Sequence, residues 1–249
     1  MPSVAVLKIK EIYDARADIP FDGSTNSQEV TAAIDLLVDH VPSRSSRICD
    51  VGCGAGWHLK EMSRRGYDRL FGIDLSLTNL LRTNLDNRAD DALLAQGDVA
   101  DWGVQGFFDV VLNFNSCLGA FDRQHDMTFL TGVRRILRNH GLLILTYTSR
   151  EVAEQRVGDF RMTYDRSSLT EVHSTVSFDN RLGRLLIEQR VNDAFLPHEH
   201  FDVYSEAEMQ SLLEGSGFYM MQNLRTSRIW VDDSPLRFLS GVIACKKPL

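Results

Sequence analysis

The chain has 249 residues, of which 43% are hydrophobic and 24% are charged. This is an ordinary globular composition, which excludes collagen-like, coiled-coil and disordered chains, and the length fits one large α/β domain. The net charge of −7 argues against a general nucleic-acid binder, which normally carries a basic stripe. The apolar run Leu142–Leu145 is far shorter than the roughly 20 residues of a membrane helix. Four unevenly spread cysteines make no disulfide framework, so we expect a cytoplasmic location.

An amphipathic helix over Ser27–His40 is the first predicted element, with Asn26 and Glu29 as its N-terminal capping residues. Short β-rich runs then alternate with helical stretches. The predicted strands are Arg47–Val51, Leu70–Ile73, Ala92–Ala95, Phe107–Asn113 and Leu142–Tyr147. The predicted helices are Trp57–Arg65, Leu77–Asn87 and Asp122–Arg138, and Gly141 suits the turn after the last of them. Such alternation is typical of a doubly wound α/β sheet.

The pattern changes after Tyr147. Apolar and polar residues alternate over Val172–Phe178 and again over Leu185–Val191, with a turn-forming segment between them, which predicts an antiparallel hairpin. A helix capped by Ser205 and Glu208 follows. Two final strands are predicted at Tyr219–Arg225 and Leu239–Lys246. We therefore expect a doubly wound, mostly parallel seven-stranded sheet with helices on both faces and an inserted antiparallel β-hairpin lid.

A glycine-rich loop, Asp50–Gly56, connects the first of these strands to a helix, and its glycines stand at alternating positions. Glycine lets the backbone turn sharply and approach a ligand closely. The Gly-x-Gly-x-Gly spacing differs from the Gly-x-Gly-x-x-Gly of dinucleotide enzymes. Three acids stand at the C-terminal ends of successive predicted strands: Asp50, Asp74 and Asp98. Because the carboxyl ends of parallel strands share one edge, these acids are expected to face one ligand crevice.

Together these motifs resemble the class I S-adenosylmethionine-dependent methyltransferases of the small-molecule type. The segments that carry the resemblance are Asp50–Gly56, Gly72–Ser76, Gly97–Val99, Phe108–Val111 and Arg135–Leu143. The resemblance covers residues 45–150 in motif detail. It implies the cofactor S-adenosylmethionine.

The resemblance also assigns parts of the cofactor to residues. Asp50, with the backbone of Gly52 and Gly54, would hold the methionine part, and Asp74 would hold the ribose hydroxyls. Asp98 would hold the adenine amino group and the Val99 backbone the adenine ring. The other residues expected at the cofactor are Cys53, Gly56, Leu75, Asn113 and Phe114, with Tyr13 closing over it.

The segment Asn113–Phe121 bears on the methyl acceptor. It lacks the Asn/Asp-Pro-Pro-aromatic motif of enzymes that methylate base amines and the acids of protein arginine methyltransferases. Asn113 stands where metal-dependent catechol enzymes have a metal-binding Asp. The remaining resemblance is to metal-independent enzymes that methylate an amine or hydroxyl of a small molecule.

Transfer to an ammonium or hydroxyl needs a general base, and histidine is the usual choice. His198 and His200, in the densest histidine cluster, are the candidate catalytic residues; the alternative is that they are solvated loop residues. With Glu199 they are too close in sequence to converge on one metal ion, so no metal site is expected. His58 is interpreted as a packing or capping residue.

We thus expect one methyltransferase domain over residues 1–249. Its parts are an N-terminal helical cap (1–44), a cofactor-binding half (45–150), an inserted β lid (151–203) and a C-terminal helix with two strands (204–249). The expected partner is a small-molecule acceptor, with neither a membrane nor nucleic acid; a homodimer stays open. The alternative functions are an RNA or protein methyltransferase and a non-catalytic nucleotide-binding protein.

Overall fold

The computed structural model describes residues 10–14, 30–31, 33–35, 38–82, 92–114, 118–154, 157–165, 170–191, 194–224 and 239–248. Asn26, Glu29, Asn115, Cys117, Arg225 and the end of the helix predicted to reach Asn87 lie outside these residues. Residues 30–31, 33–35 and 38 are helical, within the first predicted helix.

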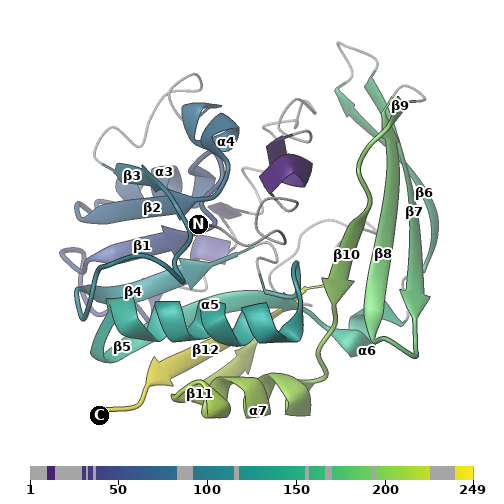
Figure 1. Ribbon diagram of the computed structural model, residues 1–249. Coiled ribbons are helices and arrows are strands. Elements are labelled where there is room, and N and C mark those ends of the chain that lie inside the picture. The colour runs from purple at the N-terminus through teal and green to yellow at the C-terminus, as the bar shows by residue number, and fades with distance from the viewer. Residues whose placement is uncertain are drawn as a thin grey trace.

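The main sheet of the described chain has seven strands in the order β11-β12-β5-β4-β1-β2-β3 (Figure 1). Their bounds are β1 (Ile48–Val51), β2 (Leu70–Asp74), β3 (Leu93–Gln96), β4 (Phe108–Asn113), β5 (Leu137–Thr148), β11 (Phe218–Leu224) and β12 (Leu239–Lys246). Five strands run parallel, with Cys49 of the central strand β1 between Phe71 and Val111. In this sheet, β12 runs antiparallel to both of its neighbours, β5 and β11, so β11 runs in the same direction as the five parallel strands. The predicted fold class is confirmed.

Alternation along the central strands places apolar side chains on both faces of this sheet, as expected when helices cover both. Val111 packs with the helices α5 (Arg123–Ile136) and α7 (Glu206–Gly215), whereas Val110 packs with α3 (Trp57–Arg64) and the helical residues near Ile34. Figure 1 shows α5 and α7 on one side of the sheet and α3 on the other. The short helix α4 (Leu77–Arg82) follows β2.

The boundary between α5 and β5 differs from the prediction. The helix ends at Ile136 rather than Arg138, and Leu137 already pairs with Phe108 of β4. Leu137 is fully buried, and its carbonyl accepts a hydrogen bond from the Lys246 ammonium at 2.6 Å. The residue with a positive φ in this region is His140 (60°), so Gly141 does not provide the expected glycine cap. Tertiary pairing therefore ends the helix before local sequence would.

A second, antiparallel sheet follows β5 and the short helix α6 (Arg150–Ala153), and it stands beside the main sheet in Figure 1. Its strands are β6 (Gly158–Asp165), β7 (Thr170–Asp179), β8 (Arg184–Val191), β9 (Ala194–Phe195) and β10 (Glu199–Asp202). The predicted hairpin is β7 and β8, paired from Val172↔Val191 to Asp179↔Arg184. The strands β6, β9 and β10 extend this hairpin into a five-stranded sheet.

The capping box of α7 is present as predicted. The Ser205 hydroxyl accepts a hydrogen bond from the Glu208 backbone N–H, and the Glu208 carboxylate accepts one from the Ser205 backbone N–H. The reciprocal bonds satisfy two N–H groups that the helix leaves free at its start. The first turn of α7 is therefore fixed directly after β10.

Candidate active site

The glycine loop after β1 turns through three glycines in the left-handed region. Gly52, Gly54 and Gly56 have φ values of 74°, 53° and 75°, which glycine adopts without strain. The backbone N–H groups of Gly52 and Cys53 both donate to the carbonyl of Ile73, at 2.7 and 3.2 Å. A Cβ on Gly54 would meet no atom within 4 Å. The loop is thus bonded to the end of β2, and Gly54 presents bare backbone to an open space.

That space is a cavity of about 230 Å³ at the carboxyl ends of β1, β2 and β3. Nine of the expected cofactor residues line it: Tyr13, Gly52, Cys53, Gly54, Asp74, Leu75, Asp98, Val99 and Phe114. The lining residues that the sequence interpretation did not assign to the cofactor include Trp57, His58, Asn79, Ala120, Phe121, His125 and Phe129. The cavity is therefore mainly apolar and aromatic, with a few polar groups, as small-molecule sites usually are.

Asp50, Gly56 and Asn113 are not among the described residues that line the cavity. Asp50 is 1% exposed and stands directly before Val51 and Gly52, which do line it. Asn113 donates from its side-chain amide to the Val51 carbonyl at 2.7 Å. The Asp50 Oδ2 and Asn113 Oδ1 atoms are buried acceptors without a hydrogen-bond partner in the described structure. Unsatisfied buried acceptors of this kind are costly unless a donor reaches them.

Asp74 stands at the end of β2, beside the glycine loop. Its two carboxylate oxygens accept backbone N–H groups, from Gly54 at 2.7 Å and from Ser76 at 2.8 Å. Burial raises the pKa of Asp74; the two backbone hydrogen bonds oppose this, while Asp50 and Asp14 add to it. A carboxylate has about four acceptor positions, so Asp74 can still accept ligand hydroxyls.

Asp98 follows β3 and occupies the next position along the same edge of the sheet. Its Oδ1 accepts the Ala100 backbone N–H at 2.9 Å, and its Oδ2 lies 3.8 Å from Nε2 of His125. His125 belongs to the first turn of α5, where Asp122 caps the helix by accepting the His125 N–H. The His125 ring stacks on Phe121, with centroids 4.0 Å apart. One histidine therefore links Asp98 to the aromatic wall of the cavity.

A second histidine, His58, lies in the first turn of α3 and also lines the cavity. Its Nδ1 atom is 3.5 Å from Asp50 Oδ2, and its ring centroid is 4.7 Å from that of Phe114. The sequence interpretation of His58 was packing or capping. Its position two residues after Gly56 was the available signal that it would face the ligand side of the loop.

The candidate bases His198 and His200 lie elsewhere. His200 is an exposed residue of β10, opposite Leu186 of β8. The His198 side chain is 50% exposed, and its Nε2 lies 3.5 Å from Glu188. Neither is among the described lining residues of the cavity. The structure brings His58 and His125 to the cavity instead.

The helical turn at residues 10–14 covers part of the cavity. Tyr13 contributes to the lining, and the Asp14 carboxylate accepts hydrogen bonds from the Ser76 hydroxyl and the Lys10 ammonium. Ser76 follows Asp74 by two residues. The turn is thus fixed to the same end of β2 that carries Asp74.

The described residues contain no group of three or more His, Cys, Asp or Glu side chains arranged to hold a metal ion. They also contain no helix that is long and apolar enough to cross a membrane.

A family model described as a methyltransferase domain matches residues 24–223. The chain belongs to this methyltransferase family. The match confirms the family that the motifs indicated, and it extends from before β1 into β11.

Among curated proteins, this methyltransferase is similar to the dTDP-3-amino-3,4,6-trideoxy-alpha-D-glucopyranose N,N-dimethyltransferase of Streptomyces venezuelae. The two are 33% identical over 97 residues, which is 39% of this chain and 39% of that protein. In both curated relatives that it matches, the match covers less than half of the relative's length.

Two solved methyltransferase structures share the fold over nearly the whole chain. CcbJ from Streptomyces caelestis has a TM-score of 0.73 at 15% identity, covering 96% of this chain and 97% of that one. The SAM-bound amino pentose methyltransferase CalS10 from Micromonospora echinaspora has a TM-score of 0.64 at 18% identity, covering 90% and 95%. At these identities the likeness shows the fold alone.

Proposed function

We propose that this methyltransferase uses S-adenosylmethionine to methylate an amine or hydroxyl of a small molecule, without a metal ion. The observation that carries the proposal is the cavity at the ends of β1, β2 and β3, backed by two buried acceptors that need a donor. The ligand with complementary groups is cationic at one end and carries a ribose and a purine.

The residues present fit that cofactor. An ammonium group of the methionine part would supply donors to Asp50 Oδ2 and Asn113 Oδ1, the two buried acceptors that lack a hydrogen-bond partner in the described structure. The open space beside Gly54 admits the cofactor chain close to the backbone. Asp74 would accept the ribose hydroxyls, and Asp98 with Val99 would hold the adenine. The assignment of Cys53, Gly56, Leu75, Phe114 and Tyr13 to the cofactor is part of the same proposal.

Bound S-adenosylmethionine supplies an electrophilic methyl group on a sulfonium, which becomes a neutral thioether when the methyl leaves. The task of the chain is to align an acceptor lone pair with that methyl and to exclude water, and orientation of this kind supplies much of the rate in such reactions. The aromatic side chains of Tyr13, Phe114 and Phe121 provide the dry surroundings.

The proton that the acceptor loses needs a destination. The imidazoles at the described cavity are those of His58 and His125, and we propose that one of them holds this proton. Our expectation for His198 and His200 rested on their clustering in the sequence, and their exposed positions give it no support. An amine acceptor is supported by the curated relative named for N,N-dimethylation of an amino sugar.

Calorimetric titration with S-adenosylhomocysteine tests the cofactor. We expect the folded wild-type protein to bind it, and Asp74→Ala to weaken binding by about tenfold or more, because hydrogen bonds to a charged group are lost. Asp101→Ala is the matched control, since Asp101 is exposed and does not line the cavity. Absence of binding by the folded protein, or equal binding by Asp74→Ala, would contradict the proposal.

The acceptor class needs a separate measurement. Labelled methyl transfer to a cell extract should appear in the small-molecule fraction. Label confined to RNA or protein would replace the small-molecule proposal with a macromolecular one.

The remaining parts of the proposal concern organisation. We infer that residues 1–44 act as a helical cap, 45–150 as the cofactor-binding half, 151–203 as the inserted lid that carries acceptor contacts, and 204–249 as the closing helix and strands. Buried free thiols at Cys49 and Cys245 support a reducing, cytoplasmic setting. Sedimentation velocity tests whether the chain forms a homodimer through the inserted sheet.

A further inference from the structure

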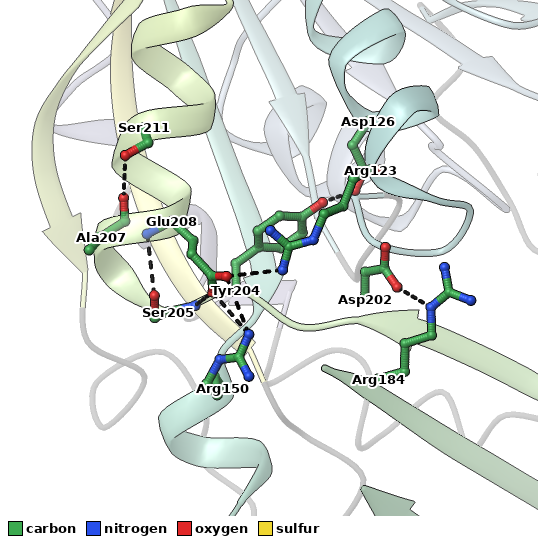
Figure 2. Close-up of polar contacts among 10 residues, drawn as sticks. All are labelled: Arg123, Asp126, Arg150, Arg184, Asp202, Tyr204, Ser205, Ala207, Glu208 and Ser211. Carbon is green, nitrogen blue, oxygen red and sulfur yellow. Dashed lines mark hydrogen bonds and ion pairs between the residues drawn. The ribbon is translucent and has the colours of Figure 1, made fainter. Parts of the chain in front are cut away.

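Asp126 is a buried carboxylate to which the proposed reaction gives no role. It lies in the first turn of α5 and is 1% exposed. Both of its oxygens accept the Gly119 backbone N–H, each at 3.0 Å. It also accepts the Tyr204 hydroxyl, which comes from the segment between β10 and α7 (Figure 2). One carboxylate thus ties together three parts of the chain.

Gly119 is held from its other side by β10. The Asp202 backbone N–H donates to the Gly119 carbonyl at 2.7 Å. Gly119 has a φ of 88°, and a Cβ there would lie 2.4 Å from the Asp202 carbonyl oxygen. The position therefore requires glycine, and the close approach brings the second sheet into direct backbone contact with the main domain.

The residues that follow Gly119 form part of the cavity. We call Leu118–Phe121 the wall segment. Ala120 and Phe121 line the cavity, and both also pack with the core of the second sheet, which includes Leu185 and Phe201. The wall segment is consequently shared between the ligand site and the sheet that we propose as the lid.

We propose that Asp126 is a positioning residue that holds the wall segment in place for the bound ligand and couples it to the second sheet. The inference rests on the proposed function for the identity of that ligand. Asp126 acts through the Gly119 N–H and the Tyr204 hydroxyl, and the side chains that meet the ligand are Ala120 and Phe121.

Several charged groups surround Asp126 and Tyr204. Burial is the largest cause that raises the pKa of Asp126, which is about 6, and the nearby carboxylates of Asp202 and Asp122 also raise it. The hydrogen bonds from Tyr204 and Gly119 act in the opposite direction. Asp202 is itself paired with Arg184 of β8. The Arg123 guanidinium lies 4.9 Å from the centre of the Tyr204 ring. Asp126 is therefore ionised at neutral pH, the state in which it accepts both hydrogen bonds most strongly.

Two variants and one control test the proposal. Asp126→Asn removes the charge, and Tyr204→Phe removes one donor while keeping the ring. The control is Glu208→Gln, because Glu208 belongs to the same cluster but its ion pairs and hydrogen bonds are with Arg123, Arg150 and Ser205 (Figure 2). Affinity for S-adenosylhomocysteine is measured by calorimetry from pH 5 to pH 8, together with hydrogen exchange of peptides covering residues 118–121 without ligand.

We expect Asp126→Asn to lose about three- to tenfold in affinity at pH 7.5, the effect of one hydrogen bond. Wild-type affinity should fall as the pH drops through about 6, where Asp126 takes up its proton, and Asp126→Asn should show a smaller fall. Tyr204→Phe should move the midpoint to higher pH, because the carboxylate loses a donor that stabilises its charge. Exchange over residues 118–121 should accelerate in both variants and stay at the wild-type rate in Glu208→Gln.

Other results overturn the proposal. If both variants keep the wild-type affinity and pH profile and are merely less stable, Asp126 has only a structural role. If exchange over the wall segment rises equally in Glu208→Gln, the coupling does not run through Asp126. Failure of the wild-type protein to bind S-adenosylhomocysteine would count against the proposed function, and the exchange data would still decide the role of Asp126.

Discussion

The floor of the cavity is made by the ends of β1, β2 and β3, whereas the wall segment lies between α5 and the second sheet. In the floor, the glycine loop is bonded to Ile73 and to Asp74 of the adjacent strand. In the wall, Gly119 is held by Asp126 of a helix and by Asp202 of a strand from another sheet. The floor is therefore fixed by hydrogen bonds within the main sheet, while the geometry of the wall depends on how the two sheets meet.

Among tests of the difference between floor and wall, the largest effect is expected from Gly119→Ala in the wall segment. We expect it to lower the free energy of unfolding by roughly 3 kcal/mol, since it combines a left-handed backbone with a steric conflict. Denaturant unfolding measures the change. Gly103→Ala is the control, because a Cβ at Gly103 meets no atom within 4 Å and its φ is ordinary. Equal losses in the two variants would show that the contact with Asp202 is not tight.

A second test uses the pH dependence of stability. Burial raises the pKa of Asp126 from 3.8 to about 6, so the folded protein keeps a proton that the unfolded chain has released. This proton therefore adds up to about 3 kcal/mol to the free energy of unfolding. The added stability is fully present below pH 3.8 and is lost as the pH rises through 6. Relative to Asp126→Asn, the wild-type protein should lose stability between pH 4 and pH 6, as followed by urea unfolding. Parallel curves would mean that Asp126 titrates normally.

A test of the floor is Asp50→Asn. Asp50 Oδ2, a buried acceptor without a hydrogen-bond partner in the described structure, stands directly before the glycine loop, so loss of its charge should weaken S-adenosylhomocysteine binding by about tenfold. Calorimetry at pH 7.5 measures this, with Asp101→Asn as the exposed matched control. If Asp50→Asn binds S-adenosylhomocysteine as tightly as the control does, the ammonium group of the ligand is held by other groups.

The smallest expected effect is at the junction between the second sheet and α7. Burial acts to raise the pKa of Glu208, but hydrogen bonds from Ser205, Arg150 and Arg123 lower it to about 2. The ionised Glu208 carboxylate therefore stabilises the folded state above pH 4.5, and this stabilisation is lost as the pH falls through 2. Glu208→Gln should cost about 1 kcal/mol at pH 7 and almost nothing at pH 2.

Thermal or denaturant unfolding at the two pH values measures this difference. Glu206→Gln, in the same first turn, is the control for the general effect of an acid near a helix start. A difference that persists at pH 2 would place the effect in packing rather than in the charge of Glu208.

The floor was the more predictable region from sequence. The glycine spacing after β1 and the acids Asp74 and Asp98 after the next strands are local signals, because each residue adjoins the strand that positions it. The hairpin of β7 and β8 was predictable for the same reason, since alternation and a turn specify it.

The wall was not predictable in this way. Asp126 and Tyr204 are 78 residues apart, and the sequence contains no signal that pairs them. The short strand β10 pairs with β8 of the second sheet, so the placement of His200, and of His198 just before it, away from the cavity follows from long-range pairing. His125 reaches the cavity because α5 begins beside Asp98, which depends on how the helix packs on the sheet.

The position of β12 has a consequence for how the chain folds during synthesis. This strand lies between β5 and β11, and the buried Lys246 side chain reaches a carbonyl 109 residues earlier in the chain. Until residues 239–246 have left the ribosome, β5 and β11 each present an open strand edge, and such edges are where nascent chains associate wrongly. The floor of the cavity can form early, but the sheet that supports it closes only when this late strand inserts.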